Sequence, residues 1–237
     1  MVYKTKGIIL HRFMHADNKM IVKIYTESSG MLSYFCFRSS GKKKNGNLFI
    51  PMSLVEITGR KKNGSHFDYI DEIHTLPESN SCRFDIAKSS VSMFLNEVLY
   101  QLLYDASEDK SLFDFLFDNL LQFSREDLLP DFHLRFLVAL IRELGFSPED
   151  NYSPDTMCFN IEKSCFEHTA FADKEEQALG LYMHQLLNED LFPQNNYTII
   201  PLLWRNKLLD TLLQYYNLHV ANFSHIKSHE ILKTILH

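Results

Sequence analysis

Apolar and polar residues alternate along the first 75 residues with a period of two, which is typical of β-strands. Five segments share this pattern and are rich in β-branched and aromatic residues: 3–13, 20–26, 31–38, 48–58 and 65–74. The turn cluster Glu27-Ser28-Ser29-Gly30 and the dipeptide Asn63-Gly64 predict tight connections between strands. Five short strands favour a small closed barrel. The five-stranded OB-fold is the leading interpretation, and an SH3-like barrel is the structural alternative.

After Pro77 the apolar period changes from two to about 3.6, which predicts helices. Apolar stripes at helical spacing begin near residues 87, 112, 130, 173, 202 and 228. Pro130 suits the start of the third helix and Gly145 its end, while Asp173 and Glu176 match a capping box. The fold class is therefore α+β: an OB-fold domain over residues 1–77, then an all-α domain over 78–237 with a small irregular or hairpin insertion near 150–170.

Composition places the chain among ordinary globular proteins. It has 237 residues, of which 45% are hydrophobic and 19 are Phe, so an aromatic-rich core is available. The longest apolar runs are about five residues, against roughly 18 for a membrane helix, and no signal-peptide pattern opens the chain. Four scattered cysteines do not form a disulfide framework. We expect a reduced, cytoplasmic, soluble protein with no membrane partner.

The net charge of −6 conceals two segments of opposite sign. Up to Thr75 the chain has twelve lysine and arginine residues against six acids, a net charge of +6, while the remainder carries −12. A basic segment attracts polyanions, whereas an acidic one does not bind nucleic acid as a whole surface. The asymmetry indicates two modules with different partners; the alternative is a solvated surface that varies along the chain.

The sequence lacks the motifs of the commonest catalytic and phosphate-binding sites. GxxxxGK[ST], GxGxxG, GxSxG and HExxH are all absent, so no catalytic residue and no cofactor are predicted. Cys158 and Cys165 lie seven apart with His168 nearby, but zinc sites favour cysteine pairs two to four residues apart. Buried or bystander cysteines are the favoured interpretation, and no metal is predicted.

The basic module has the composition of a nucleic-acid interface. Single strands are bound by cations that follow the backbone and by aromatic rings on which bases stack. The candidate DNA-binding residues are Arg12, Tyr34, Arg38, Lys42, Lys43, Lys44, Arg60, Lys61 and Lys62. Tyr34 and Phe35 alternate on one strand, so one should face the core and the other a ligand; Tyr25 and Tyr69 are further aromatic candidates. The alternatives are core aromatics and solvated lysine loops.

Several ordered stretches resemble the bacterial recombination mediator RecO in its Bacteroidetes-like form. They include Lys4-Thr5-Lys6-Gly7-Ile8-Ile9-Leu10-His11, Gly30-Met31-Leu32-Ser33-Tyr34, Phe84-Asp85-Ile86-Ala87-Lys88-Ser89-Ser90, Leu144-Gly145-Phe146 and Ile226-Lys227-Ser228-His229-Glu230. The resemblance covers nearly the whole chain and rests on the ordered set.

The resemblance implies a non-catalytic DNA repair and recombination role. Proteins of this family bind single- and double-stranded DNA, anneal complementary strands and work with RecR to load RecA onto DNA coated by single-strand binding protein (SSB). They also bind the acidic, Phe-ending tail of SSB in the helical domain. Many carry a four-cysteine zinc module, whose paired cysteines are missing between Cys158 and His168. The resemblance thus implies a cytoplasmic, nucleoid-associated protein.

For the SSB tail we predict a site at Arg135, Val138 and Arg142. The two arginines are seven apart, hence on one helix face, and an arginine can bind a terminal carboxylate bidentately. The alternative is that each arginine pairs with local Asp or Glu. Two rival functions remain open: a protein-only scaffold without DNA binding, and an unrecognised hydrolase for which no acid pair is nominated.

Overall fold

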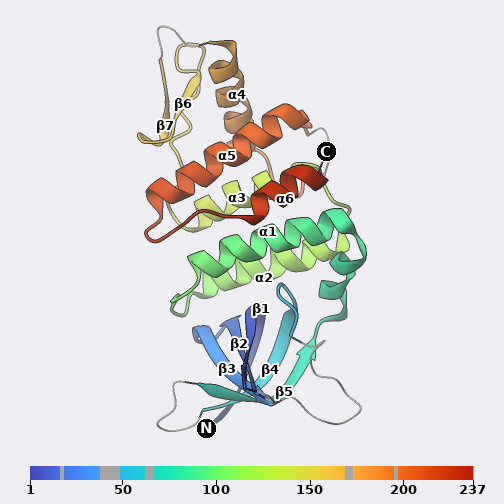
Figure 1. Cartoon of the computed structure of the whole chain (residues 1–237). Helices are drawn as coiled ribbons and strands as arrows, with labels where there is room; N and C mark the ends of the chain where they lie inside the picture. Colours follow the sequence, from blue (N-terminus) through green and yellow to red (C-terminus); the bar gives the residue numbers. More distant parts are fainter. Residues whose placement is uncertain (17–18, 38–48, 62–66, 169–172, 195–196, 237) are drawn as a thin grey trace. The chain divides into compact units, whose positions relative to one another are not determined.

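A computed structural model describes the chain except for residues 17–18, 38–48, 62–66, 169–172, 195–196 and 237. The first five strands form a closed barrel in the order β1-β2-β3-β5-β4 (Figure 1). They are β1 (Val2–Ala16), β2 (Lys19–Thr26), β3 (Gly30–Phe37), β4 (Leu54–Arg60) and β5 (Asp68–Thr75). All neighbours are antiparallel except β3 and β5. This is the predicted five-stranded OB-fold barrel, which is confirmed.

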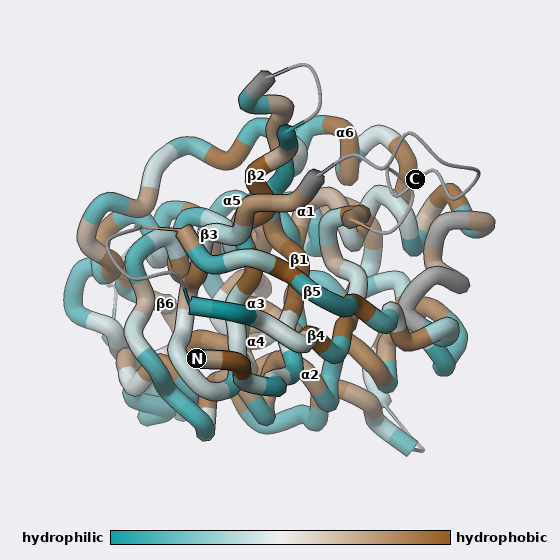
Figure 2. The backbone as a smooth tube through the Cα atoms, turned by 90° about the horizontal axis from the view of Figure 1, so that it is seen from below, coloured by the Kyte–Doolittle hydropathy of each residue, from teal (hydrophilic) through white to brown (hydrophobic). Residues whose placement is uncertain are grey.

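The long strand β1 closes the barrel because it pairs with two partners. Its first part pairs with β4, from Val2 opposite Arg60, and its second part pairs with β2, as far as Ala16 opposite Lys19. Figure 2 shows hydrophobic stretches, drawn in brown, along β1 and β2, where Ile8, Ile9, Leu10 and Val22 are all fully buried. The interior is filled by buried side chains that include Ile9, Val22, Ile24, Tyr34, Cys36, Phe49, Val55 and Ile57.

The fourth strand is shorter than the sequence predicts. The sequence predicts an extended strand over residues 48–58, but β4 begins only at Leu54. Ahead of it the chain turns: the Ser53 N–H donates to the Ile50 carbonyl at 3.1 Å, and Met52 has φ 66°. Pro51 occupies the second position of this turn, which its fixed φ favours. The proline and the turn therefore interrupt the apolar run, and the Asn63-Gly64 prediction lies outside the described residues.

Two helices pack against the barrel in the first compact unit, Met1–Asp127. A 3-10 segment, η2 (Pro77–Phe84), leads to α1 (Ile86–Leu102), and α2 (Lys110–Arg125) follows; Figure 1 shows both helices beside the barrel. Each α-helix begins at a capping aspartate: Asp85 accepts from the Lys88 N–H, and Asp109 from the Leu112 N–H. The predicted domain boundary at residue 77 stays a prediction, while the compact unit extends to Asp127.

The second compact unit, Leu128–His237, is mainly helical. It contains α3 (Phe132–Glu143), α4 (Lys174–Asn188), α5 (Leu202–His219), α6 (Ser228–Ile235) and the short hairpin of β6 (Cys158–Asn160) and β7 (Cys165–Glu167). The capping box of Asp173 and Glu176 and the positive φ of Gly145 are found as the sequence indicates. The hairpin is attached to α5 because Ser164 Oγ lies 2.9 Å from the Tyr215 hydroxyl.

Candidate nucleic-acid interface

The outer face of the barrel carries a row of aromatic side chains across neighbouring strands. Ile21 on β2 is directly opposite both Phe13 on β1 and Phe35 on β3, and Phe35 is in register with Tyr69 on β5. Directly opposed residues share a face of the sheet. The adjacent Val22 and Tyr34 belong to the barrel core, so Phe13, Ile21, Phe35 and Tyr69 lie on the opposite, outer face, where Ile21 itself is buried at 3% exposure.

Around Phe35 the rings are in mutual contact. Its centroid lies 4.4 Å from that of Phe67, 6.1 Å from that of Tyr69 and 5.7 Å from the imidazole of His15. Phe35, Phe67 and Tyr69 are each partly exposed, and Phe13 is 41% exposed. Contacts between rings hold them in place, while their exposed parts remain available to a ligand.

A second group of rings continues the row from β1 to α1 and to the turn that follows it. The imidazole of His11 stacks on Tyr100 at 4.9 Å between centroids and lies 5.9 Å from the ring of Phe13. Lys23 Nζ is 3.6 Å from the ring centroid of Tyr104, and Tyr104 is 50% exposed. Burial, followed by the nearby charge of Lys23, lowers the pKa of His11, so the neutral ring is favoured in this cluster. We call the rings of His11, Tyr100 and Tyr104, together with those of Phe13, Phe35, Phe67 and Tyr69, the aromatic face.

Tyr34 is not part of the aromatic face. The sequence left open which of Tyr34 and Phe35 faces outward, and the structure assigns that position to Phe35. Tyr34 is fully buried, and its hydroxyl lies 3.1 Å from the hydroxyl of Tyr3, which donates to Asp68 at 2.5 Å. Burial raises the pKa of Tyr34 to about 12. Its ring has no exposed surface on which a base could stack, so the prediction of Tyr34 as a DNA-contacting residue is corrected: Phe35, not Tyr34, is the partly exposed residue of the pair.

The predicted cations are only partly within the described residues. Arg60 is exposed and in register with Tyr69, which places it at the margin of the aromatic face, although it also forms an ion pair with Asp71 at 3.1 Å. Arg12 is exposed but opposite Val22, so it lies on the other side of β1 from Phe13. Lys61 is exposed next to Arg60. The remaining predicted cations, Arg38, Lys42, Lys43, Lys44 and Lys62, lie outside the described residues.

Register shows where those basic segments join the barrel. Phe37, the last residue of β3, is opposite Lys19, and Arg60, the last residue of β4, is opposite Tyr69. Because Tyr69 is also in register with Phe35, both strands end on the same side of the barrel. The ends of β3 at Phe37 and of β4 at Arg60 therefore border the aromatic face.

The residues predicted for an SSB tail are not equally accessible. Arg135 is 2% exposed; its guanidinium donates to both carboxylate oxygens of Asp131 at 3.0 Å and lies 2.5 Å from a carboxylate oxygen of Glu189. Burial alone would lower the pKa of Arg135, but its hydrogen bonds to Asp131 and Glu189 raise it. Val138 is also buried, at 2%. The alternative of local pairing thus holds for Arg135, whose donors are already used inside the second unit.

Arg142 is exposed, unlike Arg135. Its Nη2 donates to the Leu187 carbonyl at 2.8 Å, which fixes the side chain against the end of α4. The structure does not bring the two guanidinium groups together as one carboxylate clamp, since each has a separate set of partners. A site for the SSB tail at Arg142 stays a prediction.

The cysteines do not form a metal site in the described part of the chain. Cys158 is opposite Glu167 on the β6–β7 hairpin, while Cys165 is opposite Asn160. Among the described residues, no three His, Cys, Asp or Glu side chains lie together in a way that could hold a metal ion. In the same part of the chain, no helix has the length and apolar character needed to cross a bilayer.

Comparison with known proteins identifies both parts of the chain. A family model described as "Recombination protein O N terminal" matches residues 1–77, and one described as "Recombination protein O C terminal" matches residues 83–229. Proteins named DNA repair protein RecO are 31% identical in Azobacteroides pseudotrichonymphae and 32% identical in Flavobacterium johnsoniae, each over 99% of both chains. The chain therefore belongs to the recombination protein O family.

Proposed function

We propose that this protein acts in DNA repair by binding single-stranded DNA on the aromatic face. The observation that carries the proposal is the register that places Phe13, Phe35 and Tyr69 on one outer face of the barrel. Consecutive unstacked bases need a row of ring faces, and each stacked base contributes about 1–3 kcal/mol. OB-folds bind oligonucleotides on the outer face of their second and third strands, which are β2 and β3 here.

Cations at the margin of this face would neutralise the DNA backbone. Lys23 is held above the rings of Tyr100 and Tyr104, and Arg60 follows Tyr69 at the other side of the row. Backbone contacts supply affinity without reading sequence, so the proposed interface has little sequence preference. The basic segments 38–44 and 60–62 add further positively charged side chains to the same domain.

We further propose the finer role that the family resemblance implies. Binding of two complementary strands would support annealing, and together with RecR the protein would help load RecA onto SSB-coated DNA in the cytoplasm. The curated relatives are named for DNA repair, which supports the coarser role. The acidic remainder of the chain, with a net charge of −12 after Thr75, suits protein partners better than DNA.

Fluorescence anisotropy with a labelled single-stranded oligonucleotide tests DNA binding. Phe35→Ala should weaken binding by about 1–3 kcal/mol, equal to about 5- to 150-fold, because one stacking surface is lost. Phe84→Ala is the matched control, since Phe84 is 93% exposed in the same unit and lies outside the barrel. An equal loss of affinity for the oligonucleotide in both variants would contradict the proposal. So would the absence of binding by the unaltered protein at low salt, which would favour a protein-only scaffold.

A further inference from the structure

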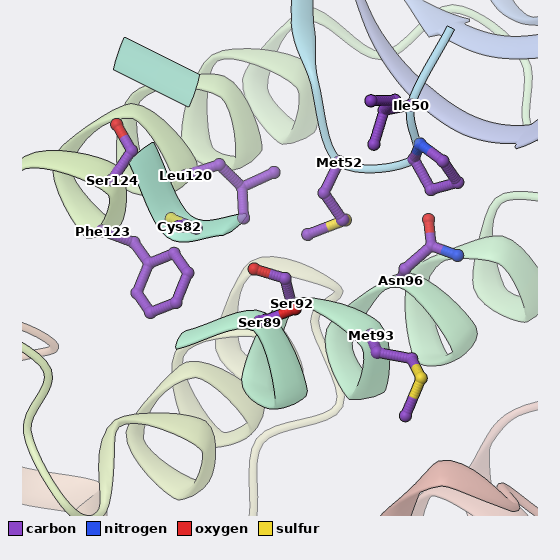
Figure 3. Close-up of a pocket in the computed structure, with 11 residues that line it drawn as sticks. Ile50, Met52, Cys82, Ser89, Ser92, Met93, Asn96, Leu120, Phe123 and Ser124 are labelled. Carbon is purple, nitrogen blue, oxygen red and sulfur yellow. The ribbon is translucent and has the colours of Figure 1, made fainter. Parts of the chain in front are cut away.

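A cavity of about 240 Å³ lies within the first unit, apart from the aromatic face. Figure 3 shows the side chains around it. They come from the turn before β4, from η2, from one face of α1 and from α2: Ile50, Met52, Cys82, Ser89, Ser92, Met93, Asn96, Leu120, Phe123 and Ser124. Most of the surface is apolar, with the polar groups of α1 on one side.

Asn96 gives the cavity a definite chemical requirement. Its Oδ1 is buried and has no hydrogen-bond partner among the described residues. A buried acceptor left unpaired is costly, and native structures seldom retain one without a reason. A ligand that supplies an N–H or O–H donor at this point would satisfy Asn96 and remove that cost.

Met52 adds a second sign that the cavity is a binding site. Its φ of 66° is in the left-handed region, a position that turns normally give to glycine or asparagine. A methionine there is strained, yet its side chain lines the cavity. Met93 on the opposite wall is 44% exposed. Flexible methionine side chains can adapt to the shape of a ligand.

We propose that this cavity binds the indole ring of a tryptophan side chain presented by a partner protein. Indole is a large apolar ring whose N–H donates and does not accept, which matches a single orphan acceptor in apolar surroundings. A dry cavity of about 150 Å³ accommodates benzene, so the larger volume here suits a bicyclic ring. Phenylalanine lacks the donor, and a charged donor would be costly to bury.

The margin of the cavity favours a protein over a free small molecule. Ile86 is three and seven residues before Ser89 and Met93 on α1, hence on the same side of the helix. It is 75% exposed, so the apolar surface continues from the cavity to the outside. The main chain next to a bound tryptophan would cover Ile86, whereas an isolated ring would leave it exposed.

Nuclear magnetic resonance of the full chain with labelled methionine methyl groups tests this inference. The probes are N-acetyl-L-tryptophanamide, its 1-methylindole derivative and free indole. We expect the amide to shift the Met52 and Met93 signals, the 1-methyl derivative to bind about tenfold more weakly, and the capped amino acid to bind at least as well as indole.

The variant Asn96→Leu should weaken binding to the same extent as N-methylation. Asn119→Leu is the control, because the Asn119 amide donates to the Phe115 carbonyl on α2 and does not line the cavity. Equal affinity for the amide and its 1-methyl derivative would overturn the inference without relying on any variant. Absence of shifts at Met52 and Met93, or binding of indole but not of capped tryptophan, would also overturn it.

Discussion

Replacing Arg135 by methionine should destabilise the second unit strongly. Methionine keeps an unbranched side chain but is shorter and uncharged, so the carboxylate of Asp131 stays fully buried without its cation. Removal of one partner from a buried ion pair costs about 3–5 kcal/mol. With a urea dependence of about 1.5 kcal/mol per molar, the unfolding midpoint should fall by about 2–3 M.

Urea unfolding followed by the fluorescence of Trp204 measures this effect. Trp204 is the single tryptophan of the chain and lies in the second unit, so its signal reports on the unit that contains Arg135. Arg142→Met is the matched control on the same helix, and because Arg142 is exposed it should change stability by less than about 1 kcal/mol.

A second substitution separates the ion pair from simple packing. The double variant Asp131→Leu with Arg135→Met removes both charges and should recover at least half of the lost stability, since no uncompensated charge remains at Asp131. If Arg135→Met unfolds at the same urea concentration as the Arg142 control, the buried network is not structural and Arg135 would again be open to a role in binding an SSB tail.

Four further outcomes are expected. Gly30→Ala should destabilise the first unit by about 3 kcal/mol or more in urea unfolding, because φ is +67° and the added Cβ would lie 2.3 Å from the Ala106 carbonyl oxygen; a change below about 1 kcal/mol would refute this. Asn96→Leu should raise the thermal midpoint by stabilising the protein by about 1 kcal/mol, and a lower midpoint would show that its amide is satisfied. Burial, followed by the charge of Arg205, lowers the pKa of His133 to about 3. Below about pH 6.5 the unfolded chain takes up a proton that the folded chain does not, so the free energy of unfolding should fall by about 1.4 kcal/mol per pH unit. An unchanged pH profile in His133→Gln would contradict this. Elemental analysis should find only substoichiometric zinc, whereas one zinc per chain would show that Cys158 and Cys165 have ligands beyond the described residues.

The sequence predicts the elements well because period and capping are local properties. The barrel strands, the Asp173 capping box and the Gly145 helix end follow from residues within a few positions of one another. The sequence predicts too long a strand over 48–58 because its apolar residues continue through the turn at Pro51 and Met52.

The binding surfaces depend on contacts between distant residues, which a single sequence does not show. Which of Tyr34 and Phe35 faces outward depends on strand register, and the addition of Tyr100 and Tyr104 to the aromatic face depends on how α1 packs on the barrel. Phe13 could have been found from the alternation along β1, since it lies two residues after His11 on the same side. The pairing of Arg135 with Glu189 could not be predicted from the sequence, because the two residues are far apart in the chain and meet only through the packing of the second unit.

Photochemical cross-linking to single-stranded DNA tests the central claim most directly. An oligonucleotide with 5-iodouracil would be bound to the full chain at low salt, irradiated, and the linked peptides identified by mass spectrometry. Stacking on the aromatic face predicts links to Phe13, Phe35 or Tyr69 that disappear at high salt as the DNA dissociates. Links confined to Leu128–His237, or to barrel residues on the other side from Phe35, would contradict the account.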